Sequence, residues 1–501
     1  MRKLVIVLLL IAFCVVPCGC QKEQPASIAI VPLDSRPCNT QYAVLLGEMA
    51  GYEVLIPNEA LLDQFTQPSD AEQLWDWLDE TESDHYILFT NQLMNGGLIN
   101  SRSLASYQDE ALFFSQLDRF LEQHKDSTVT MISVLPRLLP SQYDVELWQY
   151  QKELSAYGSA VDFALQNKDA LPTPPKTVPK AWVDQYLALY QTNYEMLLKL
   201  SAYAKENVSL VIGQDDAQQY CPSNIIYRVM QEQQCENVTL LHGADELTML
   251  TVAKYNANPT SLRIIYSDET EKHSYYPYEG VDLLTALEEK AAYVNITFDE
   301  SAKDTLIIHT NPSSLTETKR LLDDSYEGYV ALADIAYTNK GDIGLTKLLF
   351  TEELFQKIHC YSGWNTASNT LGTVLAHYQI SQNYADNKTA EKAALAFKLT
   401  RYSEDQVYQG HISNLLRGEL MQTKHMDTTT AFVDESSYEI AMEKLNSMFD
   451  PYGAKLQTLA TGTQEILPGI RFDCKKASYT VRFPWTRAFE IYAGWEVFLG
   501  K

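Results

Sequence analysis

The chain has 501 residues, of which 46% are hydrophobic and 21% are charged. These proportions are close to the globular average, so they exclude a disordered chain, a collagen-like fibre and a low-complexity fibre. Asp and Glu number 65 against 39 Lys and Arg, which gives a formal net charge of −26. This acidity argues against nucleic-acid binding, because contacts to a phosphate backbone need clustered Lys and Arg. At about 100–200 residues per domain, the length fits two to four domains, or one large α/β unit with additions.

The N-terminus carries the pattern of an export signal. Two basic residues precede an apolar run over residues 4–16, which is too short to span a bilayer but suits a secretory signal peptide. Gly19 and Cys20 then precede an abrupt change to polar residues. This arrangement resembles a bacterial lipoprotein signal, in which the Cys is acylated and becomes the mature N-terminus. We expect a signal peptide over 1–19, lipidation at Cys20, a tether over 20–26 and an extracytoplasmic location on the cell membrane, with soluble secretion as the alternative.

The cysteines beyond the signal do not suggest a metal site. Five remain, an odd number, and no two form a C-x-x-C pair: Cys38, Cys221, Cys235, Cys360 and Cys474. A zinc site needs closely spaced cysteines, and a disulfide framework needs an even number of them. Buried free thiols are therefore the favoured interpretation, with one bridge between Cys221 and Cys235 as the alternative. We predict no metal and no cofactor.

Ten short apolar runs alternate with helical stretches between Ser27 and about Asn365. Near-continuous apolar strands of this kind are typical of a parallel sheet that is covered on both faces. The expected strands are 28–32, 53–56, 86–89, 129–134, 210–212, 238–241, 262–266, 305–308, 329–332 and 358–361.

This pattern predicts an α/β fold with a mostly parallel sheet, and two architectures fit it. An elaborated (β/α)8-like barrel is favoured, because many strand ends carry acids, amides and arginines. Two consecutive doubly wound domains, divided near residue 200, are the alternative. A proline-rich stretch over 171–179 predicts a loop between two helices at about 144–166 and 181–206.

The remaining sequence predicts a helical cap with a small C-terminal β element. Helical patterns cover about 388–420 and 434–449, and strand-like segments follow at 478–483 and 489–498. We therefore divide the mature chain into an α/β catalytic or ligand-binding domain over 27–380 and a helical cap with C-terminal strands over 381–501.

In parallel α/β folds, ligands bind at the carboxyl ends of the strands, so we sought candidate residues there. The first strand leads into Asp34 and Arg36, an acid and a guanidinium that suit a polyhydroxylated or anionic ligand. A local ion pair that braces the loop is the alternative. Further substrate-binding candidates follow the third and ninth expected strands or lie between the two C-terminal strand-like segments: Asn91, Gly96, Gly97, Arg102, Asp334 and Arg487.

Carboxylates follow two central strands as adjacent pairs, Asp215 with Asp216 and Asp245 with Glu246. Hydrolysis of a glycosidic bond needs two carboxyl groups, one kept protonated and one ionised. We therefore predict these four residues as catalytic. The alternative for each is a helix N-cap, because Asp between a strand and a helix caps well.

Trp364 and Asn365 lie in an unusual segment rich in amides and hydroxyls. An indole that stacks on the C–H face of a sugar, beside an amide that binds hydroxyls, is typical of a carbohydrate site. A buried Trp with Asn365 as a helix cap is the alternative. A functional site predicts that Asp34, Asp216, Asp245, Asp334 and Asn365 converge on one pocket.

Several motifs together resemble one bacterial family, domain of unknown function 4127. They are Pro32–Pro37, Gly96–Arg102, Asp215–Ala217, Gly243–Glu246, Asp334–Asn339, Gly363–Thr366 and Pro484–Glu490. They extend over nearly the whole mature chain. The resemblance marks positions and implies no activity, because the family has none established.

The first functional hypothesis is a membrane-anchored carbohydrate-active hydrolase, glycosidase-like, whose partner is a carbohydrate or an envelope polymer. Neither a G-x-S-x-G elbow nor an H-E-x-x-H motif occurs, which disfavours a serine hydrolase and a zincin protease. The alternatives are a non-catalytic envelope lipoprotein that binds a ligand, and a metal-dependent hydrolase that uses carboxylates with His242 or His309.

Overall fold

The computed structural model describes residues 25–107 and 109–500. The predicted signal peptide, the predicted lipidation site Cys20 and most of the predicted tether lie outside these residues. In the part of the chain that the structure describes, no helix is long and apolar enough to cross a membrane.

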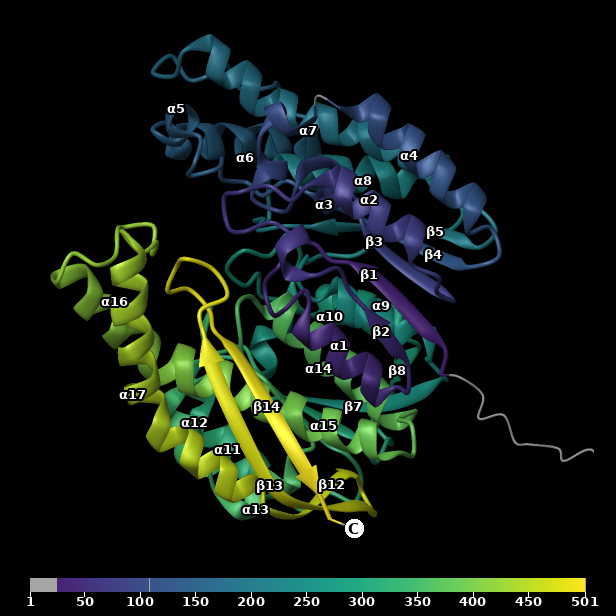
Figure 1. Ribbon diagram of the computed structural model, residues 1–501. Coiled ribbons are helices and arrows are strands. Elements are labelled where there is room, and N and C mark those ends of the chain that lie inside the picture. Colours follow the sequence, from purple (N-terminus) through teal and green to yellow (C-terminus); the bar gives the residue numbers. More distant parts are fainter. Residues whose placement is uncertain (1–24, 108, 501) are drawn as a thin grey trace, which may run out of the picture.

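The chain folds into two parallel sheets and one small antiparallel sheet near the C-terminus (Figure 1). The first sheet has the order β2-β1-β3-β4-β5-β6 and the second has the order β11-β10-β9-β7-β8. All strand pairs within these two sheets are parallel. The strands are β1 (Ser27–Val31), β2 (Glu53–Leu55), β3 (His85–Phe89), β4 (Thr128–Leu135), β5 (Val208–Gln214), β6 (Val238–Leu240), β7 (Thr260–Tyr266), β8 (Ile296–Phe298), β9 (Thr305–His309), β10 (Val330–Asp334) and β11 (Cys360–Ser362).

The predicted α/β class with mostly parallel strands is confirmed. Each of the ten apolar runs overlaps one strand of the two sheets. Of the strands in these two sheets, β8 alone was not predicted; it has only three residues.

Seventeen α-helices occur among the described residues. They are α1 (Gln41–Met49), α2 (Ala71–Glu80), α3 (Thr90–Asn95), α4 (Glu110–Gln123), α5 (Val145–Trp148), α6 (Gln151–Asn167), α7 (Lys180–Ser201), α8 (Pro222–Gln233), α9 (Leu247–Tyr255), α10 (Leu283–Tyr293), α11 (Leu315–Asp323), α12 (Ile343–Leu349), α13 (Glu352–Lys357), α14 (Ala367–Gln382), α15 (Lys388–Arg401), α16 (Ser413–Gln422) and α17 (Glu435–Ala460). A π-helix, Tyr402–Ile412, joins α15 to α16.

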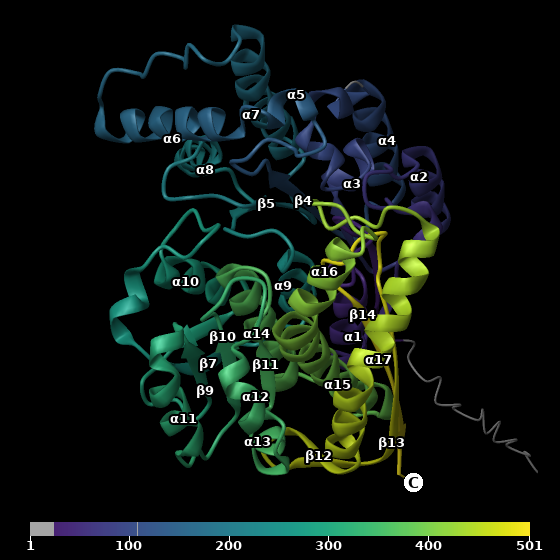
Figure 2. The same cartoon turned by 90° about the vertical axis from the view of Figure 1, so that its left-hand side faces the viewer.

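The six-stranded sheet is buried on both faces, which explains its continuous apolar strands. Ile28 and Ile30 of β1 belong to a large core that extends into the five-stranded sheet. Ala29 and Val31 of the same strand belong to a second core with residues of α2, α4 and α7. Since successive strand residues point to opposite faces, both faces of this sheet are covered. Figure 2 shows α6, α7 and α8 on the side of this sheet that is remote from the five-stranded sheet.

The C-terminal region adds helices and the antiparallel sheet β12-β13-β14, as its composition predicts. The strands are β12 (Gly462–Leu467), β13 (Ile470–Arg482) and β14 (Tyr492–Leu499). β12 was not predicted, because its alternating polar residues resemble the end of the preceding helix. The hairpin β13–β14 places its connecting loop beside the six-stranded sheet (Figure 1).

Candidate functional site

A cavity of about 370 Å³ lies at the carboxyl ends of strands from both parallel sheets. Eight of the predicted site residues line it: Asp34, Arg36, Arg102, Asp215, Asp216, Asp245, Asn365 and Arg487. The strand-end rule for parallel sheets therefore located seven of the residues that line this cavity, all of these except Arg487. Of the five residues whose convergence was expected, only Asp334 does not line it.

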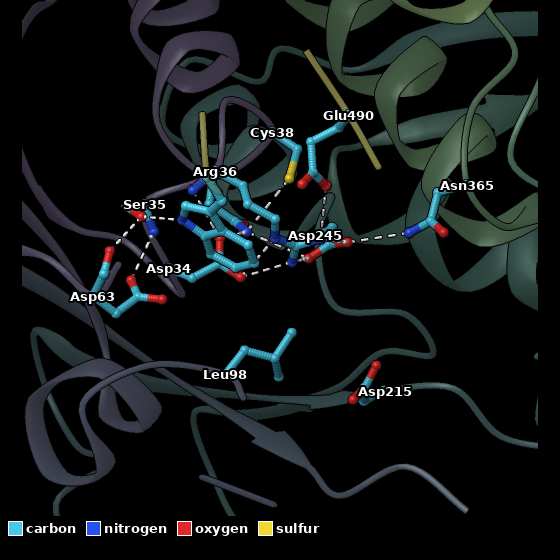
Figure 3. Close-up of polar contacts among 12 residues, drawn as sticks. Asp34, Ser35, Arg36, Cys38, Asp63, Leu98, Asp215, Asp245, Asn365 and Glu490 are labelled. Atoms are coloured by element: carbon cyan, nitrogen blue, oxygen red, sulfur yellow. Dashed lines mark hydrogen bonds and ion pairs between the residues drawn. The ribbon is translucent and has the colours of Figure 1, made fainter. Parts of the chain in front are cut away.

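The first cluster in the cavity is centred on Asp245, which is bonded to Arg36 after β1 and to Asn365 after β11 and so links the two sheets. The guanidinium of Arg36 donates to Asp34 at 2.8 Å and to Asp245 at 2.5 and 3.3 Å. Asn365, which follows β11, donates to Asp245 at 3.1 Å. Figure 3 shows these four side chains in contact, with Asp215 set apart from them. The Arg36–Asp34 pair expected as a loop brace is present, and it also orients Arg36 toward Asp245.

The second cluster follows β4 and β5. Arg102 donates to the Asp215 carboxylate at 2.5 and 3.0 Å. The backbone of Asp215 donates to Leu135 at 3.2 Å, and Leu138 donates to the Asp216 carbonyl at 2.9 Å. These bonds extend the pairing of the two strands beyond the sheet. They hold Asp215 and Asp216 beside Arg137, which also lines the cavity.

The two neighbouring carboxyl groups of this cluster differ in electrostatics. Burial and the charge of Asp215 raise the pKa of Asp216 to about 7. Burial also acts to raise the pKa of Asp215, but the charges of Arg102 and Arg137 outweigh it and lower that pKa. Opposed shifts in adjacent carboxyl groups separate a proton donor from an ionised partner.

Asp245 has a raised pKa, caused first by burial and opposed by the Arg36 charge. It is 5% exposed and accepts hydrogen bonds from Arg36, Asn365 and Asn39, the last at 3.3 Å. Three donors fix the orientation of this carboxylate at the cavity wall.

Two loops from the C-terminal region close one side of the cavity. We call them the cover loops, residues 427–431 and 485–489. Backbone bonds of 2.9 Å join them, from Phe432 to Thr486 and from Ala488 to Thr430. Trp485 donates its indole N–H to the hydroxyl of Ser35 at 2.7 Å, which ties the cover loops to the segment after β1.

Glu246, predicted as catalytic, does not line the cavity. It is fully buried, lies 3.4 Å from the Lys290 ammonium and accepts a hydrogen bond of 2.6 Å from Asn369. It is also the N-cap residue of α9, although its side chain makes no capping bond. In the described helices, no side chain of Asp215, Asp216 or Asp245 forms a capping bond, contrary to the capping alternative.

Three further candidates support the segment that follows β3. Asn91 exchanges hydrogen bonds with the backbone of Val134 on β4, at 2.8 and 3.1 Å. Gly96 and Gly97 end α3 with φ values of 77° and 117°, a conformation that glycine adopts without strain. A side chain on Gly97 would collide with Asp63. These residues shape the turn that carries Arg102 and do not line the cavity.

Asp334 and Trp364 are buried outside the cavity. Asp334 accepts a bond of 2.6 Å from the backbone of Asp342, and burial raises its pKa to about 6. Trp364 packs edge-on against Tyr42 and donates its indole N–H to Thr373 at 3.1 Å. Its position matches the buried-Trp alternative. Thr366, and not Asn365, caps α14.

Several residues that line the cavity were not among the predicted site residues. Arg137 follows β4, so its strand-end position was a usable signal. Arg417 lies within α16, and no feature of the sequence places that helix near the strand ends. The other lining residues that were not predicted are Leu98, Ile99, Leu139, Gln142, Tyr143, Tyr278, Asn339, Thr428, Thr429, Thr430, Trp485 and Phe489.

No group of three or more His, Cys, Asp or Glu side chains with the arrangement of a metal site occurs in residues 25–107 and 109–500. The cysteines predicted as free thiols form no disulfide in this part of the chain.

Comparison with protein families gives one match, to the family described as protein of unknown function (DUF4127), over residues 28–494. No curated protein and no solved structure matches the chain.

Proposed function

We propose that this chain, which belongs to the DUF4127 family, is a carbohydrate-active hydrolase anchored through Cys20 on the outer side of a membrane. The observation that carries the proposal is the side chain of Asp216 in the cavity. Among the described residues, Asp216 makes hydrogen bonds through its backbone alone, so its carboxyl group is free to meet a substrate.

Asp216 has the properties of a general acid. Burial and the neighbouring charge of Asp215 keep its carboxyl group protonated up to about pH 7. A protonated carboxyl can donate to the oxygen of a glycosidic bond as the bond breaks. Proton transfer of this kind contributes about 10²- to 10⁴-fold to the rate.

Asp245 supplies the second carboxyl group, as base or nucleophile. Arg36 and Asn365 hold its oxygens at 2.5–3.3 Å, which fixes its direction. Asp215 contributes through its charge, because its bonds to Arg102 keep it ionised beside Asp216. Aromatic rings of Tyr143, Tyr278 and Phe489 offer apolar surfaces for the C–H faces of a sugar.

A binding lipoprotein without turnover is the second candidate. The observation in its favour is that residues after strands of both parallel sheets line one cavity. Ligand sites between two such units are common in proteins that bind without reacting. Release of reducing sugar from a glycan is expected of a hydrolase and not of a binding protein, so its measurement distinguishes the two candidate functions.

The test compares substitutions of two predicted catalytic acids, Asp216, which lines the cavity, and Glu246, which does not. We expect Asp216→Asn to lower hydrolysis of a glycan panel by about 10²-fold or more and to leave the melting temperature at about pH 4, where Asp216 carries its proton, nearly unchanged. Glu246→Gln is the matched control. It removes a buried charge beside Lys290, so we expect a loss of stability of about 3–5 kcal/mol.

Measurements of sugar release and thermal unfolding check both variants. Full activity of Asp216→Asn on a glycan that the unaltered chain cleaves would exclude Asp216 as the acid. A large fall in its melting temperature would instead assign it a structural role.

A further inference from the structure

The charged residues of the cavity are nearly equal in number and unequally paired. Five arginines line it, Arg36, Arg102, Arg137, Arg417 and Arg487, against four aspartates, Asp34, Asp215, Asp216 and Asp245. The whole chain is strongly acidic, with a formal charge of −26. With Glu490, which pairs with Arg487, five carboxyl groups face these five arginines, so the cavity is close to balanced in charge within a strongly acidic chain.

Three of the five arginines are already neutralised by carboxylates of the protein. Arg36 pairs with Asp34 and Asp245, and Arg102 pairs with Asp215. Arg487 pairs with Glu490 at 2.9 Å and lies over the ring of Trp485. Each of these three arginines therefore already has a carboxylate of the protein as its counter-ion.

Arg137 and Arg417 form no ion pair with any residue that the structure describes. Arg137 donates to the carbonyls of Leu139 and Pro140, both at 3.1 Å. Arg417 donates to the carbonyl and hydroxyl of Ser413, both at 3.2 Å. Neutral acceptors orient both guanidinium groups, and neither group has a carboxylate of the described residues within ion-pair distance.

A half-buried cation without a counter-ion costs free energy, which an anionic ligand would offset. Burial, together with the charge of Arg102, outweighs the opposing charges of Asp215 and Asp216 and lowers the pKa of Arg137 to about 10. A guanidinium can bind a carboxylate or a phosphate with two parallel hydrogen bonds. The hydroxyl groups of Thr428, Thr429 and Thr430 lie on the same cavity wall as further donors.

We propose that Arg137 and Arg417 bind an anionic group of the substrate, a carboxylate or a phosphate carried by a sugar. This inference rests on the proposed function, because it takes the ligand of the same cavity to be a sugar. It makes the substrate an acidic glycan. The remaining free carboxyl group, that of Asp216, then faces the neutral part of the ligand.

Isothermal titration calorimetry with three simple sugars tests the inference on the full-length chain. Glucuronate carries a carboxylate, glucose 6-phosphate carries a phosphate, and glucose carries neither. We expect at least one anionic sugar to bind about tenfold or more tightly than glucose, and the better of the two identifies the anion. None of the three contains a glycosidic bond, so the result is independent of whether the chain hydrolyses glycans.

Substitutions locate the anion site. We expect Arg137→Gln and Arg417→Gln each to weaken binding of the preferred anionic sugar by about tenfold and to leave binding of glucose unchanged. Arg320→Gln is the matched control, since Arg320 is exposed on α11 and pairs only with its helix neighbours. Circular dichroism checks folding, and Arg137→Lys serves if Arg137→Gln is unfolded, because it keeps the charge and should keep part of the affinity.

Three results would overturn the inference. The first is equal binding of the three sugars, and the second is no binding of either anionic sugar. The third is anionic binding that stays unchanged when both Arg137 and Arg417 are replaced by Gln in a folded chain.

Discussion

Asp215 and Asp216 are adjacent in the sequence, yet their surroundings give their carboxyl groups opposite tendencies. Asp215 accepts two bonds from Arg102, and its pKa is lowered. Asp216 has no such partner among the described residues, and burial beside a negative charge raises its pKa to about 7. One step along the backbone therefore separates an ionised group from a group that holds a proton.

The activity should depend on pH through this proton. If Asp216 is the general acid, kcat/KM falls as the pH rises through about 7, because the carboxyl group loses the proton it must donate. We expect a tenfold fall per pH unit on the alkaline side, measured on any glycan the chain cleaves. The Asp216→Asn variant should lose this limb, and a profile that is flat up to pH 9 would contradict the assignment.

The pH dependence of the free energy of unfolding depends on the same Asp216 proton and can be measured without any activity. A raised carboxyl pKa in the folded chain stabilises that state at low pH, and the contribution is lost as the pH rises through the folded pKa of about 7. Asp216→Asn has no proton to lose. We therefore expect the difference in free energy of unfolding, variant minus unaltered chain, to increase between about pH 4 and pH 8 in urea titrations. A difference that is independent of pH would show that Asp216 does not titrate in this range.

At the scale of elements, the cover loops are attached to the six-stranded sheet by a buried hydrogen bond and by the packing of Trp485 against Phe65 and Ile99. The Ser35 hydroxyl accepts from the Trp485 indole at 2.7 Å and donates to the Asp63 carbonyl at 2.5 Å. It thus connects the segment after β1 with the hairpin β13–β14, 450 residues away in the sequence. The contact holds one cavity wall against the other.

Removal of this hydroxyl should lower stability measurably. Ser35→Ala leaves the buried N–H of Trp485 without an acceptor, so we expect a loss of about 1–3 kcal/mol in urea unfolding. Trp485→Phe removes that N–H. In a double-mutant cycle the combined variant should therefore lose less than the sum of the two single losses. Additive losses would mean that the hydrogen bond does not couple the two elements.

How far the sequence predicts this site depends on which element carries each residue. Asp34, Asp216, Asp245 and Asn365 follow parallel strands, and such strands meet at one edge, so their position in the chain located them. Arg417 and Thr428–Thr430 come from a helix and a loop of the C-terminal region, whose packing no local pattern encodes. Asp245 and Glu246 are adjacent acids, and only their packing separates a cavity residue from the buried partner of Lys290.

The fold class was predictable for a physical reason that applies to the whole molecule. A parallel strand buried on both faces is apolar throughout, as in β1 and β9, so it is recognisable from sequence alone. The division of the strands between a six-stranded and a five-stranded sheet depends on contacts between distant segments. The strands β8 and β12 contain few apolar residues, so the sequence pattern did not identify them.

Across the whole molecule, the C-terminal sheet is both a structural support and a cavity wall. Trp495 on β14 donates to Ser403 of the π-helix at 3.0 Å, and Tyr408 donates to the Ala488 carbonyl at 2.9 Å. A chain that ends at Ala460 loses these contacts and exposes the apolar face of α15. We expect its melting temperature to fall by at least about 10 °C.

Circular dichroism and calorimetry check this truncation against a control chain that ends at Gly500, which should behave like the full chain. The truncated chain should also bind neither anionic sugar, because Trp485, Arg487 and Phe489 are missing from the cavity. Unchanged melting would show that the C-terminal sheet is a dispensable addition.

The distribution of the cavity along the chain also sets the time at which it is completed. Its residues begin at Asp34 and end at Phe489, so the last of them is synthesised long after the first. Domains generally fold from the N-terminus during synthesis, so the six-stranded sheet can form while the cavity still lacks a wall. A chain synthesised only as far as β11 therefore has no complete site, because Arg417 and the cover loops are still missing from the cavity.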